Sequence, residues 1–154
     1  MRVPPVQIKE AAALAGRLLV AALFLHEAWS KLTGYSAAVL YAQAFGVPGA
    51  LMPFAIALEI GCGVLILLGY YTRPAALLLA GFCIATAVLF HIKLGNRNEL
   101  LHFEKDLAIA GGLLVLFAHG AGRWALDAQP WRSSQSDAAA LRAHAPSLPG
   151  RSQR

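Results

Sequence analysis

The sequence predicts an all-α integral membrane protein, folded as an antiparallel up-down-up-down bundle of four transmembrane helices. Of its 154 residues, 58% are hydrophobic and only 14% are charged, whereas soluble domains average about 25% charged residues. The mean hydropathy is +0.57. Most hydrophobic residues fall into long stretches that contain few charges, as membrane-spanning helices do. This composition excludes disorder for most of the chain, and two cysteines are too few for a disulfide-stapled secreted fold.

Four stretches are expected to span the membrane. The first, residues 11–29, would be about 28 Å long as a helix, at about 1.5 Å per residue. The second, residues 48–69, contains Glu59 as its only charged residue, and the third, residues 74–91, contains no Asp, Glu, Lys or Arg. The fourth, residues 103–120, is long enough only if its charged first turn lies at the membrane surface.

Proline and glycine mark the ends of these stretches. Pro48 and Pro74 stand where the first turn of a helix tolerates proline, and Gly69 follows the second stretch. The link 70–73 is so short that the second and third helices are expected to form an antiparallel hairpin. The longer link 30–47 is expected to be a polar and aromatic connection. Residues 1–127 thus form the membrane domain, and residues 128–154, rich in Ser, Gln, Pro, Ala and Arg, are expected to be a basic disordered tail.

Lysine and arginine are distributed unequally between the two sides of this arrangement. Eight lie on the side of the two termini and the link 70–73, and four lie on the other side. The positive-inside rule therefore places both termini in the cytoplasm, as in a multi-pass protein of a bacterial inner membrane. Most of the net charge of +5 comes from the tail, so the basic character indicates contact with the lipid bilayer and no nucleic-acid partner.

Charged residues inside or beside a membrane span suggest a functional site, because placing them there is costly. The four-span topology brings the outer ends of three helices together. Glu59 lies beneath them, near the middle of the bilayer, where a carboxylate needs a partner, a proton or a polar cavity. The alternative is that the outer residues are separate, solvated charges at helix ends. The outer cluster consists of His26, Glu27, Lys31, His91, His102, Glu104, Lys105 and Asp106.

A second polar group lies at the cytoplasmic end and is expected to be structural. Arg17 either reaches the cytoplasmic surface or pairs inside the bundle, and Arg73 lies in the short link. Arg123 and Asp127, four residues apart, are expected to cap the end of the fourth helix. No metal site is expected, because the histidines come from separate segments without the spacing of metal ligands. The two cysteines are expected to be unpaired packing residues, because they lie at different depths.

Several short motifs recur in an order that is typical of one known family. They are Gly-Arg-Leu-Leu at 16–19, Ser-Lys-Leu-Thr-Gly at 30–34, Gly-Val-Pro at 46–48, Glu-Ile-Gly-Cys-Gly at 59–63, Leu-Gly-Tyr-Tyr-Thr-Arg-Pro-Ala-Ala at 68–76 and Gly-Ala-Gly-Arg-Trp-Ala-Leu-Asp at 120–127. Over about residues 12–127 the chain resembles the DoxX family of small four-helix proteins of the bacterial inner membrane. This resemblance implies a four-helix bundle with cytoplasmic termini. It also implies a link to oxidoreductases, because related proteins are described as subunits of thiosulfate:quinone oxidoreductase or of other membrane oxidoreductase complexes.

The expected function is therefore a redox-associated membrane subunit that binds a quinone or a partner oxidoreductase. In this hypothesis Glu59 relays protons with the help of His26 or His91, and neighbouring charges bind the substrate. Two other functions stay open: a non-enzymatic scaffold or assembly factor for a membrane complex, and a small transporter that acts as an oligomer. Whether the chain is itself catalytic, and whether it forms homo-oligomers, also stays open. The candidate substrate-binding residues are Lys31, Lys105, Asp106 and Glu27.

Overall fold

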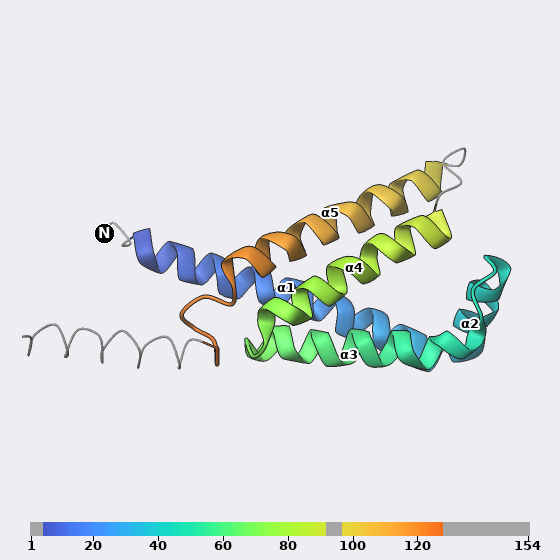
Figure 1. The fold of residues 1–154 in the computed structure, drawn as a ribbon, viewed down its shortest axis with the longest axis horizontal. Coiled ribbons are helices and arrows are strands. Elements are labelled where there is room, and N and C mark those ends of the chain that lie inside the picture. The colour runs from blue at the N-terminus through green and yellow to red at the C-terminus, as the bar shows by residue number, and fades with distance from the viewer. Residues whose placement is uncertain (1–4, 92–96, 128–154) are drawn as a thin grey trace, which may run out of the picture.

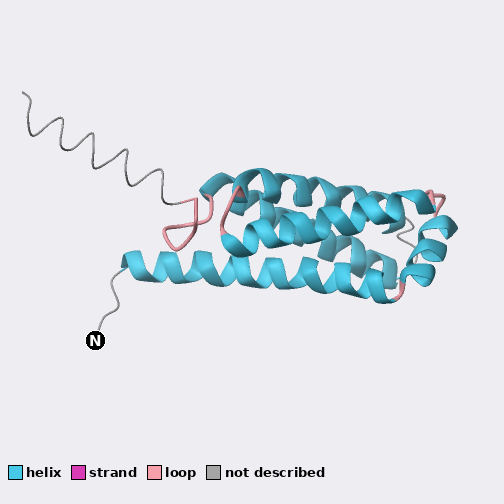
Figure 2. Cartoon of the chain, turned by 90° about the horizontal axis from the view of Figure 1, so that it is seen from below, coloured by secondary structure: helices cyan, strands magenta, loops and turns pink. Residues whose placement is uncertain are grey.

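The computed structural model describes residues 5–91 and 97–127. Within these residues the chain is all-helical, with five α-helices, one short 3₁₀ helix and no β-strand. Four of the α-helices are long and lie along a common direction, and the short α2 lies at one end of them (Figures 1 and 2). The long helices are α1 (Pro5–Thr33), α3 (Met52–Leu68), α4 (Thr72–His91) and α5 (Arg97–His119).

Each long helix contains most or all of one predicted hydrophobic stretch, but the bounds differ. Helix α1 has 29 residues and extends beyond 11–29 at both ends. Helix α5 begins six residues before 103, because the polar segment that precedes the hydrophobic stretch continues the same helix. Helix α3 begins after a single 3₁₀ turn, Gly49–Leu51, which takes up the start of the stretch 48–69.

The link 30–47, expected to be a polar and aromatic connection, is largely helical. It contains α2 (Tyr35–Ala44), which directly follows α1. Ten residues are too few to show a convincing helical pattern, and short helices depend on packing for their stability. Here the packing comes from three aromatic rings: Tyr41 lies 5.0 Å from Phe45 and 5.7 Å from Phe90, between ring centroids. The second contact holds α2 against the end of α4.

Gly69 ends α3 and turns the chain into α4. Its φ of +66° is in the left-handed region, and its N–H and that of Tyr70 bond to carbonyls of the last turn. This is the usual way in which glycine terminates a helix. The chain therefore reverses direction within three residues, and α4 runs back along α3 (Figure 1).

The long helices pack as two pairs that share one core. Helix α1 packs mainly on α3, and α4 packs mainly on α5, while α3 and α4 join the two pairs. The α4–α5 pair diverges from the α1–α3 pair toward the end that carries α2 (Figure 1). Small side chains such as Ala21, Ala76 and Ala80 dominate the core, with Ile66, Leu79 and Leu113 as its large buried members. Small residues allow helices to approach closely, as is typical of helix packing in membranes.

The segment 120–127 closes the opposite end of the molecule. Arg17 is 2% exposed, and its Nη1 donates to the carbonyl oxygens of Ala121 at 2.9 Å and Trp124 at 3.2 Å. The Asp127 carboxylate accepts hydrogen bonds from the backbone N–H groups of Tyr71 and Thr72, both at 2.9 Å. Asp127 therefore caps the start of α4, and the expected cap on the end of the fourth helix is not what the structure shows.

The other two predicted structural residues also lie at this end. The backbone N–H of Arg123 donates to the Glu10 carboxylate of α1. Arg73 Nη2 donates to the carbonyl of Ala118 at 3.5 Å. The segment after α5 is thus bonded to α1, to the α3–α4 turn and to α4. Arg17 pairs inside the protein, which was one of its two expected roles.

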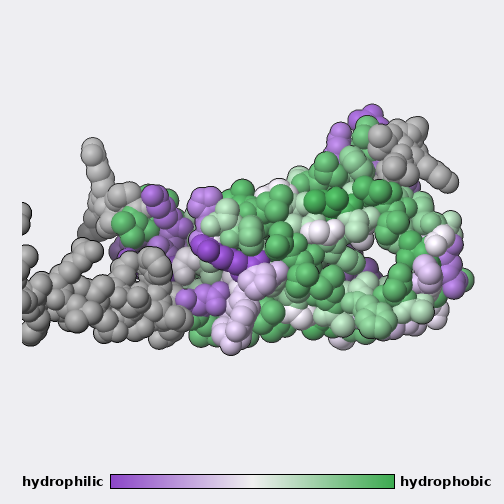
Figure 3. Space-filling model, viewed as in Figure 1, coloured by the Kyte–Doolittle hydropathy of each residue, from purple (hydrophilic) through white to green (hydrophobic). Residues whose placement is uncertain are grey.

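Hydrophobic side chains cover much of the outside of the long helices. On the face shown in Figure 3 they spread over the middle of the molecule, and hydrophilic residues gather toward its two ends. Within the described residues, two helical segments are long and apolar enough to cross a membrane, Gly49–Leu68 and Thr72–Phe90. The first and fourth predicted spans carry more charges, and their crossing stays a prediction.

Candidate functional site

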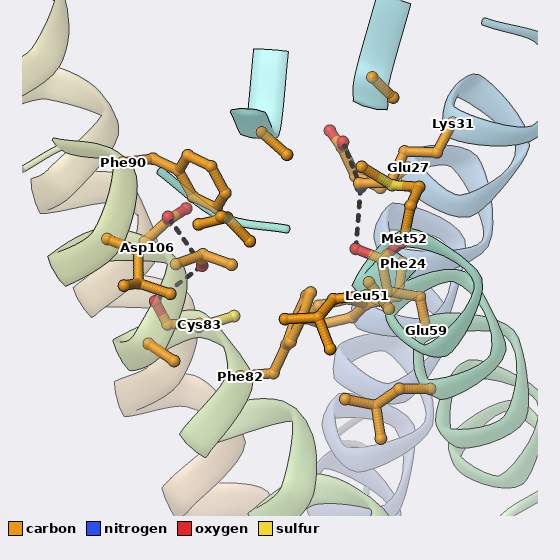
Figure 4. Close-up of a pocket in the computed structure, with 18 of the residues that line it drawn as sticks. Phe24, Glu27, Lys31, Leu51, Met52, Glu59, Phe82, Cys83, Phe90 and Asp106 are labelled. Carbon is orange, nitrogen blue, oxygen red and sulfur yellow. Dashed lines mark hydrogen bonds and ion pairs between the residues drawn. The ribbon is translucent and has the colours of Figure 1, made fainter. Parts of the chain in front are cut away.

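A cavity of about 680 Å³ lies between the two helix pairs, near the end where they diverge. All five α-helices contribute side chains to its lining, and most of these side chains are apolar. Figure 4 shows Cys83 and Asp106 on one side of the cavity and Glu27, Lys31 and Glu59 on the other. The cavity thus has two polar walls, one on α1 and α3 and one on α4 and α5, separated by apolar side chains.

The wall on α1 and α3 is built around an ion pair. Lys31 Nζ lies 2.9 Å from Glu59 Oε1 and 3.4 Å from Glu27 Oε2. Glu27 and Lys31 are one helical turn apart on α1, so they share a face. The Glu59 side chain is only 3% exposed, whereas that of Glu27 is 47% exposed. Lys31 therefore connects a buried carboxylate with one that reaches the protein surface.

A glycine lets α1 and α3 approach closely enough to form this wall. Gly63 stands one turn after Glu59 on α3, and a Cβ atom added there would lie 3.2 Å from the Leu25 side chain of α1. Contacts that short are tight, so a side chain at 63 would require the Leu25 side chain to shift. Close approach allows the Lys31 ammonium group to reach Glu59.

Glu59 is incompletely satisfied. Its Oε1 accepts a hydrogen bond from Lys31, but its Oε2 is buried and has no hydrogen-bond partner within the described residues. A buried polar atom without a partner costs free energy and calls for an explanation such as a ligand or water. The side chain of Glu59 lines the cavity, so a molecule bound there can supply the missing partner.

The wall on α4 and α5 is built around Thr86 and Asp106. Thr86 Oγ1 lies 2.9 Å from the carbonyl oxygen of Cys83 and 3.3 Å from Asp106 Oδ2. Lys105 Nζ lies 3.4 Å from His102 Nδ1 on the same helix. Asp106, Lys105 and His102 all line the cavity.

Aromatic side chains form much of the apolar lining. Phe24 of α1, Phe82 and Phe90 of α4, and Tyr41 of α2 all line the cavity. Burial, with a smaller contribution from the negative charge of Glu99, raises the pKa of the Tyr41 hydroxyl above its ordinary value. Because flat ring systems pack well against aromatic faces, this lining suits a ligand that contains a ring.

The structure brings together some of the sequence-predicted site residues and leaves others apart. His26 is exposed on α1, and Glu104 is exposed on α5; neither lines the cavity. The side chain of His91 lies outside the described part of the chain. Among the described residues, no group of three or more His, Cys, Asp or Glu side chains is placed to hold a metal ion. The predicted residues that do line the cavity are Glu27, Lys31, Glu59, His102, Lys105 and Asp106.

The sequence analysis missed the aromatic lining and Thr86. Thr86 carried a signal, because it is the only hydroxyl residue in the apolar stretch 74–90. The aromatic residues carried no signal of their own, because apolar aromatics occur throughout the spans. Only their convergence from three helices distinguishes them.

Comparisons with known proteins identify the family. The DoxX family model matches residues 12–92. The inner membrane protein YqjF of Escherichia coli is 40% identical over 121 residues, which cover 79% of this chain and 93% of that protein. The chain belongs to the DoxX family. The inner membrane protein YphA of Escherichia coli is 30% identical to this DoxX protein, over 74% of this chain and 86% of its own length. The uncharacterized membrane protein Rv3486 of Mycobacterium tuberculosis is 31% identical, over 72% of this chain and 76% of its own length.

The names of these relatives support a location of this DoxX protein in a bacterial inner membrane. No solved structure matches the chain. The polar wall on α1 and α3 lies wholly within the matched residues 12–92, whereas Asp106 and Lys105 lie beyond them. The cavity is therefore lined both by residues within the family match and by α5, which follows the matched residues.

Proposed function

We propose that this DoxX protein crosses the inner membrane four times, with α1, α3, α4 and α5 as an antiparallel bundle and both termini in the cytoplasm. The support is that all four helices expose large apolar side chains. Leu19 of α1 and Phe54 of α3 are each 73% exposed, and Val115 of α5 is 60% exposed. Exposed apolar surface of this extent is typical of a surface covered by lipid. In this arrangement the cavity lies in the outer half of the bilayer.

We further infer that the cavity binds a quinone or a similar flat, mostly apolar molecule, and that the chain is a redox-associated membrane subunit that works beside a partner oxidoreductase. The observation that carries this proposal is the apolar, aromatic-lined cavity of about 680 Å³ with an ion-paired carboxylate in its wall. Small-molecule sites typically have this volume and this mixture of apolar lining with a few polar groups.

The residues present fit a quinone ring. Phe24 and Phe82 lie in the apolar lining, and Glu59 and Asp106 lie on the polar walls at either side. The unpartnered Oε2 of Glu59 would accept a hydrogen bond from a hydroxyl group of the reduced form of such a ligand. When bound, a quinone would supply a carrier for two electrons and two protons.

The proposed role of the α1–α3 wall is to move protons between the cavity and the protein surface. Glu59 holds a proton or releases it at the buried end, and Glu27 exchanges protons with water at the exposed end. Lys31 lies within hydrogen-bond distance of both carboxylates and stabilises whichever one is ionised. In this proposal Glu27 replaces His26 as the partner of Glu59, because His26 does not line the cavity.

The test is native mass spectrometry of the protein extracted gently from its own membrane. We expect a bound mass that matches the quinones of that membrane, and we expect its occupancy to fall at least several-fold in Glu59→Gln. Glu104→Gln is the matched control, because Glu104 is an exposed carboxylate outside the cavity; it should leave the occupancy unchanged. A stoichiometric partner protein without any small molecule would overturn the quinone proposal and favour a scaffold.

A further inference from the structure

The two polar walls of the cavity share an unusual feature: each contains a carboxylate that is short of hydrogen-bond donors. Glu59 Oε2 has no donor within the described residues. Within the described residues, the donor to Asp106 is the Thr86 hydroxyl, which lies 3.3 Å from Oδ2 and closer, at 2.9 Å, to the Cys83 carbonyl. A hydroxyl group has a single hydrogen to donate. Because the Cys83 carbonyl competes for that hydrogen, the Asp106 carboxylate has only a shared donor, on one of its two oxygens.

The cationic residues around the cavity leave Glu59 Oε2 without a partner within the described residues. Lys31 is placed between two carboxylates, Glu27 and Glu59, so most of its donor capacity is already used. Lys105 lies against His102. A ligand that enters the cavity therefore meets an unpartnered acceptor on one wall and, on the other, an acceptor whose donor is shared. Such a site favours a molecule that donates hydrogen bonds, because bringing another acceptor against a carboxylate would desolvate both without compensation.

We propose that the cavity selects the reduced, hydroxyl-bearing form of its ligand, a hydroquinone, over the oxidised quinone. This inference rests on the proposed function. A quinone presents two carbonyl oxygens, which only accept hydrogen bonds. A 1,4-hydroquinone presents two hydroxyl groups at opposite edges of the ring, which matches carboxylates on opposite walls (Figure 4). One hydroxyl donates to Glu59 and the other to Asp106.

The experiment compares three ligands of nearly equal shape. Binding of a short-chain benzoquinone, its hydroquinone and the dimethyl ether of that hydroquinone is measured anaerobically on the full chain in lipid nanodiscs. The ether keeps the ring but lacks both donors, so it isolates the contribution of hydrophobic burial. We expect the hydroquinone to bind at least about tenfold more tightly than either of the others, as one charge-assisted hydrogen bond provides.

Two variants assign the preference to the carboxylates. Glu59→Gln and Asp106→Asn replace an acceptor-only group with an amide that also donates, so each should lower the hydroquinone-to-quinone ratio severalfold. Glu104→Gln should leave the ratio unchanged. Gel filtration and helical circular dichroism confirm that each variant is folded.

The outcomes separate this inference from the proposed function. If none of the three ligands binds, the proposed function fails and this inference fails with it. If the quinone binds as tightly as the hydroquinone, or more tightly, the function stands and the selectivity is overturned. A tenfold preference that both variants leave intact would also overturn the assignment to Glu59 and Asp106.

Discussion

Lys31 determines the electrostatics of the cavity at the scale of single residues. It is the one cation that contacts Glu59 within the described residues, at 2.9 Å, and it is 24% exposed while Glu59 is 3% exposed. A buried ion pair adds little net stability, but removing one partner leaves an uncompensated buried charge. The pair should therefore behave asymmetrically when its two members are mutated.

We expect Lys31→Met to lower the free energy of unfolding by about 3 kcal/mol. This value is at the lower end of the range of about 3–5 kcal/mol for breaking a buried ion pair, because Lys31 is partly exposed. Adding Glu59→Gln to this variant should recover most of the loss, because it removes the unpaired charge. The measurement is unfolding in mixed detergent micelles followed by circular dichroism. Lys9→Met, at an exposed position on α1, is the control. A double variant that is less stable than Lys31→Met would refute this account of the pair.

The α3–α4 turn shows how an element boundary depends on tertiary contacts. Gly69 adopts φ +66°, and a Cβ atom there would lie 2.5 Å from both the Ala125 Cβ and the Arg17 Nη1. Glycine is therefore required for two reasons, the backbone conformation and the space that segment 120–127 occupies. The turn, the buried arginine and the segment after α5 form one interlocked structure.

We expect Gly69→Ala to destabilise the protein by at least about 2 kcal/mol, because the left-handed conformation alone costs about 1–2 kcal/mol with a side chain and the contacts add to it. Gly61→Ala is the matched control. Gly61 lies within α3, with nothing inside 4 Å of an added Cβ, so the change should be neutral or stabilising by about 0.5–1 kcal/mol. Thermal unfolding of the two variants side by side tests this. Equal stability of both variants would show that segment 120–127 does not pack on the turn.

At the scale of the whole molecule, the arrangement of two helix pairs explains both the stability and the site. The pairs are bonded together by Arg17, Asp127 and segment 120–127 at one end, and they diverge at the other, where the cavity lies. Together with the positive-inside rule, this geometry predicts that the end with segment 120–127 faces the cytoplasm and that the end with the cavity faces the other side.

Labelling of introduced cysteines tests this topology, and the native cysteines give little background because both are buried. In intact cells, a membrane-impermeant maleimide should label Ser36→Cys on α2 but should label Lys9→Cys near the start of α1 only after lysis. Both positions are exposed in the structure. If α1 did not cross the membrane, positions 9 and 36 would lie on the same side and would label together.

Much of the fold follows from local composition, which the sequence displays directly. Apolar stretches 48–69 and 74–91 indicate α3 and α4 because so few charges occur in them, and Gly69 with a short link indicates the reversal between them. Helix α2 could not be predicted, because aromatic contacts to Phe45 and Phe90 stabilise it. The role of Asp127 could not be predicted either, because its partners lie 55 and 56 residues away in the chain.

The sequence by itself determined that this is a helical membrane protein of the DoxX family, and that Glu59 is an exceptional charge in an apolar span. Hydropathy and motif order are properties of the chain alone, so no fold is needed to observe them. Tertiary structure decided which polar residues meet. It joined Glu59 to Lys31 and Glu27, placed Asp106 on the facing wall and left His26 outside. The reason is that helix rotation and pairing, which depend on how small residues such as Gly63 pack, determine which side chains face a shared cavity.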